Sequence, residues 1–490
     1  MKQSIFENMK SPLLLAGIGA MLVSCTDNNN EPPNVVFIFV DELRTQDLGY
    51  NGNPDVMTPH IDRLAGESID LYNTISGCPV SSPYRGSLLT GQYPLTHGVF
   101  VNDVLLDPEA VTLPKIFNSA GYETAYIGKW HLDGHGRSSF IPKERRQGFD
   151  YWKVLECTHD YNNSWYWSNN DEFKKWDGYD AFAQTRDAIN YISERKDGEA
   201  PFFLMLSWGP PHTPFQEAPE KYKQIYREKE LSIRPNVPEE YHEEVRHHLT
   251  GYYAHITALD KCVGDLQEAI RAEGIEDNTI FIFTSDHGYM IHSQGWFHKQ
   301  IFYEESIHVP FLLKFPSKFG KQGQSNEMLM NTPDIMPTLL GLIGLPIPET
   351  VEGEDLSDIL TGKRKDDTEA VLLACHHPFG QWSRPGGGKE YRGVRTKQYT
   401  YACDLEGPWA LFDNTNDPYQ LNNLISCEEH ESIRKDLHAT MENLLDKTGD
   451  SFEPGMNYIE RWNYVVDDRE TIPYREINYQ GIPIETFMKK

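Results

Sequence analysis

Four stretches of the chain are nearly continuous runs of apolar residues, each of a length typical of a strand. They are residues 34–40, 122–127, 202–208 and 279–284. Short apolar runs without alternation are typical of strands buried on both faces of a parallel sheet. Apolar residues with helical spacing lie at 113–120 and 252–270, and an acidic helical stretch begins near Pro238. This order predicts an α/β fold with a central, mostly parallel sheet flanked by helices.

The pattern changes near residue 365. Short strands such as 371–374 and 393–396 follow one another there, and a helix is expected over 432–447. At 490 residues the chain is long enough for two domains. We therefore expect a larger domain over 34–364 and a smaller one over 365–490.

Each of the four apolar runs is followed at once by residues able to bind ions or carry protons. Open α/β sheets bind ligands at the carboxyl ends of their strands, so we expect these side chains to meet at one edge. Carboxylates there suit Ca²⁺ or Mg²⁺, and a histidine in a rigid proline-rich loop suits a general acid. The residues are Asp41, Glu42, Lys129, His131, His212, Asp286 and His287.

A fifth stretch, Ser81 to Gly91, reads Ser-Ser-Pro-Tyr-Arg-Gly-Ser-Leu-Leu-Thr-Gly. Pro83 restricts the backbone of its neighbours, and the leucine pair is expected on the buried side of a short helix. Ser81 and Arg85 would then lie at a helix start, where free N–H groups favour an anion.

Composition narrows the classes of partner. Charged residues make up 24% and hydrophobic residues 39% of the chain, as in folded globular proteins. The formal net charge of −28 argues against nucleic-acid binding, which needs a basic face. It does not exclude an anionic substrate, because a local group of Arg, Lys and metal can hold one.

The amino terminus has the pattern of an export signal. Lys2 and Lys10 precede an apolar run at 13–23 that is too short to span a bilayer. Leu-Val-Ser-Cys at 22–25 is similar to a lipobox, so we expect a lipoprotein signal peptide over 1–24, lipid on Cys25 and a tether over 25–33. The alternative is a plain secretory signal. The other six cysteines form no CxxC pair, so cysteine-based zinc or redox chemistry is not indicated.

The stretch at 81–91 resembles the signature of the type I sulfatases, in the alkaline-phosphatase-like superfamily. That signature is a (Cys or Ser)-x-Pro-x-Arg core followed by Leu-Leu-Thr-Gly, and it places Ser81 at the convertible position. Cys78 lacks the proline and arginine at the required offsets. Gly-Lys-Trp-His at 128–131, Pro-His-Thr-Pro at 211–214 and Ser-Asp-His-Gly at 285–288 are similar to further family elements.

The resemblance implies an alkaline-phosphatase-like fold whose C-terminal subdomain is a small antiparallel sheet with a helix. It also implies that an anaerobic radical maturase oxidises Ser81 to formylglycine, whose hydrate attacks sulfur. Arg85, Lys129 and Lys299 would stabilise the transferred group, His212 would protonate the leaving oxygen, and His131 would take a proton from the hydrate. Ca²⁺, with Mg²⁺ as the alternative, would be held by Asp41, Glu42, Ser81, Asp286 and His287. Glu42 departs from the family's usual aspartate.

Residues around the site are expected to contact substrate. The family often has polar substrate-facing residues near His97, Asn102 and Asp103. Trp165 and Trp167 lie in an aromatic and polar region that could stack on sugar faces, or be a packed insertion. The expected substrate is a sulfated oligosaccharide from host or algal polysaccharide. The protein itself is expected to be an exported bacterial lipoprotein, located in the periplasm or anchored at the outer membrane or cell surface.

Two other functions stay open at this stage. A phosphodiesterase or phosphonate monoester hydrolase of the same superfamily would share the metal and the oxidised nucleophile. A lipid-anchored glycan-binding protein without catalysis would keep the fold and leave Ser81 unmodified.

Overall fold

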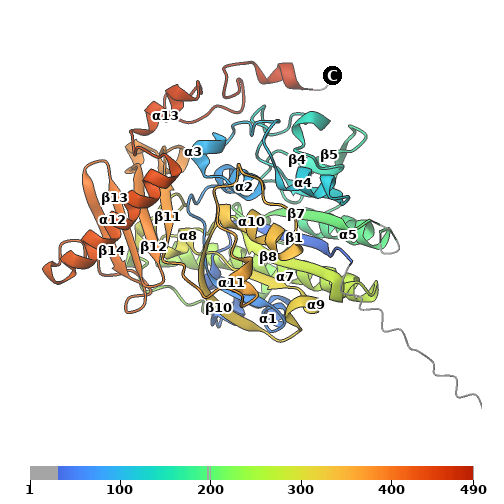
Figure 1. Ribbon diagram of the computed structural model, residues 1–490, viewed down its shortest axis with the longest axis horizontal. Helices are drawn as coiled ribbons and strands as arrows, with labels where there is room; N and C mark the ends of the chain where they lie inside the picture. Colours follow the sequence, from blue (N-terminus) through green and yellow to red (C-terminus); the bar gives the residue numbers. More distant parts are fainter. Residues whose placement is uncertain (1–30, 196–197, 199, 489–490) are drawn as a thin grey trace, which may run out of the picture. The chain divides into compact units, whose positions relative to one another are not determined.

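A ten-stranded sheet with the order β10-β2-β9-β8-β1-β7-β3-β4-β5-β6 organises this computed structural model (Figure 1). The structure describes residues 31–195, 198 and 200–488, so the predicted signal peptide and Cys25 lie outside it. The neighbours β8, β1, β7, β3 and β4 are all parallel. Their carboxyl ends therefore share one edge, which confirms the mostly parallel sheet. The strands are β1 (Asn34–Asp41), β2 (Ile69–Ile75), β3 (Glu123–Lys129), β4 (Tyr151–Leu155), β5 (Trp165–Ser168), β6 (Phe173–Lys175), β7 (Phe202–Pro211), β8 (Thr279–Ser285), β9 (Phe311–Lys314) and β10 (Gln324–Asn331).

Helices cover both faces of this sheet. Alternate residues of β1 separate the two layers: Phe37 and Phe39 pack in one cluster with α2, α4 and α10, and Ile38 and Val40 pack in another with α1, α5 and α7. The stretches expected at 238 and at 252–270 form one long helix, α7. The helices of this part are α1 (Pro59–Ala65), α2 (Ser81–Thr90), α3 (Pro94–His97), α4 (Leu113–Ser119), α5 (Asp180–Ser193), α6 (Glu220–Tyr226), α7 (His242–Ala272), α8 (Glu304–Ile307), α9 (Pro316–Phe319), α10 (Thr332–Ile343) and α11 (Ser357–Leu360).

A second, antiparallel sheet follows, made of β11 (Ala370–Cys375), β12 (Tyr391–Thr396), β13 (Tyr399–Asp404) and β14 (Gly407–Asp413). Helix α12 (Glu431–Thr448) lies across it (Figure 1) and packs Leu437, Met441 and Leu445 against it. This confirms the expected antiparallel subdomain. Residues from Pro32 onward form one compact unit, and a domain boundary between 364 and 365 stays a prediction.

A buried ion pair joins the two sheets. The Nε and Nη2 of Arg395, on β12, each lie 3.1 Å from a carboxylate oxygen of Glu304, on α8. The two side chains are 4% and 7% exposed. Burial alone would raise the pKa of Glu304, but Arg395 and His308 outweigh it and hold this pKa well below its usual value.

Replacing Arg395 by alanine is expected to lower the free energy of unfolding by about 3 kcal/mol, because it leaves the buried carboxylate of Glu304 with His308 as its remaining partner of these two. Since the folded pKa of Glu304 is depressed, its contribution is complete above the unfolded pKa and is lost as pH falls. Urea unfolding at neutral pH and at acidic pH measures both effects, and the difference between the two proteins should shrink in acid. Lys435→Ala breaks an exposed ion pair with Glu431 and is the control. An equal loss in both variants would contradict the argument.

The residues after α12 return to the first domain. Beyond α13 (Gly455–Arg461), the Tyr464 hydroxyl donates to the carbonyl of Gly98, and the ring of Tyr474 lies 3.6 Å from the Arg137 guanidinium carbon. The ring centroid of Phe487 lies 4.2 Å from that of His135. Across the described ranges, no helix combines the length and apolarity needed to cross a membrane.

Candidate active site

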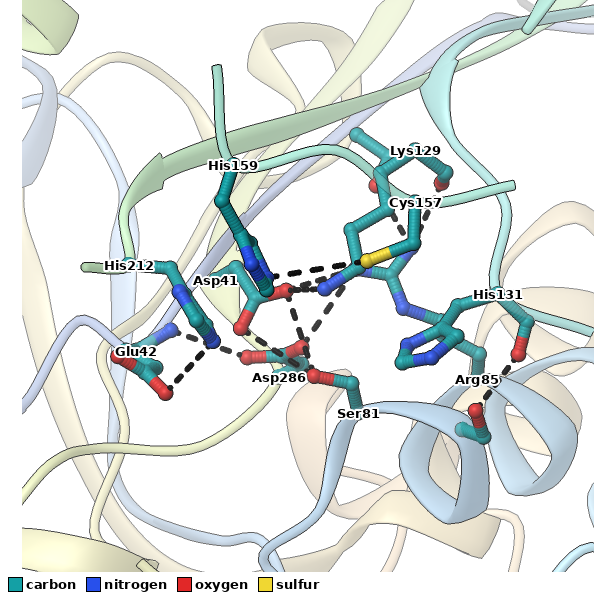
Figure 2. A network of polar contacts seen from close by, with 12 residues as sticks. Asp41, Glu42, Ser81, Arg85, Lys129, His131, Cys157, His159, His212 and Asp286 are labelled. Carbon is teal, nitrogen blue, oxygen red and sulfur yellow. Dashed lines mark hydrogen bonds and ion pairs between the residues drawn. The ribbon is translucent and has the colours of Figure 1, made fainter. Parts of the chain in front are cut away.

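Ser81 is the first residue of α2 and lies where the carboxyl ends of the central strands meet (Figure 2). Its hydroxyl oxygen is 3.2 and 3.3 Å from the two carboxylate oxygens of Asp41, at the end of β1. It is also 3.2 Å from Nε2 of His287, just beyond β8. The residue is 1% exposed. A nucleophile at position 81 would therefore be surrounded by ion-binding groups at the N-terminus of a helix.

Three cationic side chains enclose this position. Lys129 Nζ lies 2.5 Å from Asp41 Oδ2, and Arg85 Nη2 lies 3.4 Å from the same oxygen. Lys299 Nζ pairs with Glu42 Oε1. Burial alone would raise the pKa of Asp41, but Lys129, His212, His287 and Arg85 outweigh it and hold the pKa well below its usual value. Asp41 is accordingly ionised at neutral pH.

The acidic side chains fit a divalent cation. Two sets, Asp41 with Asp286 and His287, and Asp41 with Glu42 and His212, bring one potential ligand atom from each residue within 4.8 Å. Glu42 Oε2 and Asp286 Oδ2 are buried and have no hydrogen-bond partner among the described residues. Burial raises the pKa of Glu42 to about 8. Burial and the negative charge of Asp41 raise the pKa of Asp286 to about 7. A bound cation would favour the ionised form of both carboxylates, and carboxylate oxygens suit Ca²⁺ or Mg²⁺.

His287 is prepared for ligation. Its Nδ1 lies 2.9 Å from the carbonyl oxygen of Gly288, so the tautomer with the proton on Nδ1 donates there. The lone pair of Nε2 then faces Ser81 and Asp41. Burial, together with Lys299, lowers the pKa of His287 to about 3, which keeps the ring neutral as a metal ligand requires.

His212 and Lys299 form the opposite side of the site. His212 Nδ1 lies 2.7 Å from the carbonyl oxygen of Thr213, while Nε2 lies 3.1 Å from Glu42 Oε1 and 3.3 Å from Lys299 Nζ. Burial and the charge of Lys299 lower the pKa of His212 well below its usual value. With its proton on Nδ1, the neutral ring accepts a hydrogen bond from Lys299 through Nε2.

The family is settled by comparison with known proteins. A family model described as Sulfatase matches residues 33–345, which is more than half of the chain. The chain belongs to the sulfatase family. A second model, described as N-sulphoglucosamine sulphohydrolase, C-terminal, matches residues 292–447 of this sulfatase. As a sulfatase, the protein is a sulfuric ester hydrolase.

Two curated relatives cover almost the whole sulfatase. The ulvan-active sulfatase of Formosa agariphila is 44% identical, and the match covers 94% of this chain and 92% of the relative. The endo-4-O-sulfatase of Bacteroides thetaiotaomicron is 32% identical, with 91% and 96% covered.

Solved structures agree on the fold. A Bacteroides fragilis sulfatase structure matches with a TM-score of 0.78 and 33% identity, over 89% of this chain and 99% of that one. The phosphonate monoester hydrolase of Agrobacterium radiobacter matches with a TM-score of 0.70 at 21% identity, over 85% and 96%. The match to the phosphonate monoester hydrolase concerns the fold alone. The fold therefore does not by itself distinguish a sulfatase from a phosphonate monoester hydrolase.

Three residues expected to face substrate have other partners in the sulfatase. His97 is 7% exposed, its Nε2 lies 3.1 Å from Ser87 Oγ, and its Nδ1 accepts from the Val99 N–H, so its predicted contact with substrate stays a prediction. Asp103 is buried and forms a bidentate pair with Arg137 at 3.0 and 2.9 Å, and its predicted contact with substrate likewise stays a prediction.

Asn102 accepts the N–H of Ser82 at 3.0 Å and so holds the start of α2. His131 lies beside this group, because its Nε2 is 3.4 Å from Asp103 Oδ1 and its carbonyl accepts from Ser82 Oγ. Burial lowers the pKa of His131, against the opposing effects of Cys157 and Asp103. A neutral His131 ring can accept a proton, as the predicted role requires. That role stays a prediction.

The two tryptophans lie on the hairpin β5–β6. Trp167 donates its indole N–H to the carbonyl of Ser138 at 3.1 Å, so it is partly fixed by packing. Trp165 is 41% exposed and stacks on Phe173, with 5.0 Å between ring centroids. Sugar contact by either ring stays a prediction.

Two further residues, Cys157 and His159, follow β4 and lie beside the site (Figure 2), although the sequence did not predict them there. The exposed His159 ring stacks on His212, with centroids 4.6 Å apart and planes at 9°. Its Nε2 lies 3.8 Å from the sulfur of Cys157. Burial would raise the pKa of the Cys157 thiol, but Lys129, Arg137 and His131 together outweigh it and hold it well below its usual value. The sequence Tyr-Trp-Lys-Val-Leu at 151–155 could have predicted a further strand, and the polar residues after it could then have been expected at the site.

His159→Ala is expected to lower kcat/KM for a sulfated oligosaccharide by about tenfold, the size of one lost contact of about 1.4 kcal/mol. The reason is that an exposed ring stacked on His212 lies at the entrance to the site, where the alcohol part of the ester must sit. A small aryl sulfate should be turned over nearly as before. An equal loss on both substrates would assign His159 to chemistry instead.

Proposed function

We propose that this sulfatase removes O-sulfate groups from sulfated carbohydrates. The observation that carries the proposal is the position of Ser81 at the start of α2, beside Asp41 and His287 and among Arg85, Lys129 and Lys299. The names of the relatives, an ulvan-active sulfatase and an endo-4-O-sulfatase, support a carbohydrate as the alcohol part.

In this proposal Ser81 is oxidised to formylglycine by an anaerobic radical maturase. The hydrate of that aldehyde supplies a nucleophilic hydroxyl and a second hydroxyl whose deprotonation expels sulfate, which an unmodified serine lacks. Asp41, Glu42, Asp286 and His287 would hold the divalent cation, for which Ca²⁺ is the best match to the carboxylate ligands. When bound, the cation lowers the free-energy cost of negative charge on the oxygen at position 81.

The chain's own cations then hold the sulfuryl group. Arg85 is fixed through Nη1, which donates to the carbonyl of Lys129 at 2.7 Å and to Ser207 Oγ at 2.8 Å. This fixed geometry aims its other nitrogens at the centre of the site without reorganisation. His212, whose Nε2 lies 3.3 Å from Lys299 Nζ, would when protonated give its proton to the departing sugar oxygen. We propose that His131, which lies beside Ser82 and Asp103, receives the proton of the second hydroxyl.

Charge alone does not separate the proposed activity from phosphodiester hydrolysis, because a sulfate ester and a phosphodiester each carry one negative charge. The test compares release of sulfate from ulvan and glycosaminoglycan oligosaccharides with turnover of an aryl phosphodiester, using protein co-expressed with an anaerobic maturase. Sulfate release that exceeds phosphodiester turnover supports the proposal. Preferential phosphodiester turnover would favour the phosphodiesterase, and glycan binding without release would favour the non-catalytic protein.

We also propose that the sulfatase is an exported lipoprotein, anchored through Cys25 in the outer membrane or facing the periplasm. The support is the lipobox at 22–25 and the asparagine-rich tether after it. Incorporation of labelled fatty acid that is lost in Cys25→Ala tests the anchor, and unchanged labelling would contradict it.

A further inference from the structure

Three metal-ligating side chains meet outside the active site. Glu244 and His248 lie four residues apart on one face of α7, and His292 lies in the loop after β8. Glu244 Oε1 is 3.2 Å from His248 Nε2 and 3.5 Å from His292 Nε2. One potential ligand atom from each residue lies within 4.8 Å of the others. We call these residues the Glu244–His248–His292 cluster.

The spacing matches tetrahedral coordination. Zn²⁺ binds imidazole nitrogen at about 2.0–2.1 Å and carboxylate oxygen at about 2.0–2.2 Å, so neighbouring ligand atoms in a tetrahedron lie about 3.3–3.5 Å apart. The separations of Glu244 Oε1 from the two histidine nitrogens, 3.2 and 3.5 Å, lie within about 0.1 Å of that range.

Aromatic neighbours hold the His292 ring in place, but its nitrogen atoms lack hydrogen-bond partners among the described residues. It is 8% exposed, and neither ring nitrogen has a hydrogen-bond partner among the residues that the structure describes. Tyr241 stacks on the ring with centroids 4.2 Å apart and planes at 12°, and Phe297 packs on it at 4.8 Å. A buried imidazole without partners is costly. A metal ion at Nε2 would give that nitrogen a partner.

An ordinary ion pair between Glu244 and protonated histidines is the competing explanation. Burial lowers the pKa of both His248 and His292, against the opposing effect of Glu244. Neutral rings are the form that ligates metals. The backbone of the loop is in an uncommon conformation at this point. Ile291 and His292 have φ angles of 44° and 62°, a region that residues other than glycine rarely adopt.

We propose that Glu244, His248 and His292 bind a divalent transition-metal ion, with Zn²⁺ as the best match. Two imidazoles and one carboxylate form a softer ligand set than the carboxylate-rich site around Asp41. Glu244 is 55% exposed, which leaves the fourth position to solvent. The two sites therefore select different ions.

The ion would join the loop after β8 to α7. In that loop the Met290 N–H donates to the His298 carbonyl at 2.8 Å and the Ile291 N–H donates to the Phe297 carbonyl at 3.1 Å. His292 lies at the closed end of this paired segment, and Lys299 follows its other side. We infer a structural ion that holds the segment from which Lys299 reaches the active site.

The test is titration of the purified protein with Co²⁺ in excess Ca²⁺, which occupies the carboxylate-rich site. One Co²⁺ per chain should bind, with the visible absorption of tetrahedral Co²⁺ and nitrogen ligands, and Zn²⁺ should displace it. His248→Ala and His292→Ala should each raise the Kd at least about tenfold. His247→Ala removes an exposed neighbouring histidine on the same helix and should leave the Kd unchanged.

Zn²⁺ should also raise the melting temperature of the protein and of His247→Ala but not that of Glu244→Gln, whose side chain is on the surface and should not affect folding. Binding that is absent in the unaltered protein would overturn the proposal. So would a His247→Ala variant that loses as much affinity as His248→Ala. These readouts do not depend on sulfate release, so they fail or succeed independently of the proposed enzymatic function.

Discussion

Replacing Ser81 by alanine is expected to reduce sulfate release by about five orders of magnitude, or about 7 kcal/mol of transition-state stabilisation. The alanine removes the oxygen that lies 3.2 Å from both Asp41 and His287, and nothing can be oxidised in its place. Initial rates on a sulfated oligosaccharide measure the loss. The mass of the peptide containing residues 81–85 shows whether the serine protein has lost two hydrogen atoms.

Two further variants make this result specific. Cys78→Ala should keep full activity, because burial raises the pKa of that thiol to about 12 and leaves it inert. Ser81→Cys should recover activity, since the family signature admits either residue. Substantial activity of Ser81→Ala would refute the assignment of the nucleophile. A Ser81 peptide of unchanged mass in active protein would refute the need for oxidation.

Asp41→Asn is expected to lower kcat by about 10³-fold and to abolish the rise in melting temperature that Ca²⁺ produces. Asp41 is the carboxylate shared by both candidate ligand sets, and it also balances Lys129 and Arg85. The amide keeps the shape and a neutral oxygen, but it leaves buried cations without their counter-charge.

Asp47→Asn is the matched control for this change. Asp47 is also buried and also paired with an arginine, Arg44, but it belongs to neither ligand set. It should lower stability and keep the Ca²⁺ response. Retention of that response by Asp41→Asn would remove Asp41 from the metal site, whatever happened to activity.

The four strands that carry the site were predictable because they are buried on both faces. In β1, β3, β7 and β8 few polar residues lie within the apolar run, among them Glu123 and Thr124 near the start of β3, and Ser207 near the end of the run in β7. β4 was missed because Lys153 interrupts it and its neighbours are aromatic, and the hairpin β5–β6 is too short for its period to be recognised. With β4 missed, Cys157 and His159 had no expected position.

The site residues divide in the same way. Asp41, Ser81, Lys129 and Asp286 each lie within a short local pattern that marks the end of a strand or the start of a helix. The pairing of Asp103 with Arg137 has no such signal, because it depends on how two loops fold back. The contact of His97 with Ser87 on α2 also has no sequence signal, because a polar residue near a site looks the same in sequence whether it faces the pocket or a neighbouring helix.

The return of the C-terminal residues to the first domain has a consequence for the timing of maturation. Ser81 leaves the ribosome long before α10, which packs on α2, and before Tyr474, which covers Arg137. In the complete fold Ser81 is 1% exposed, so an enzyme that oxidised it would have no access. The oxidation proposed above would therefore need a chain that has not finished folding.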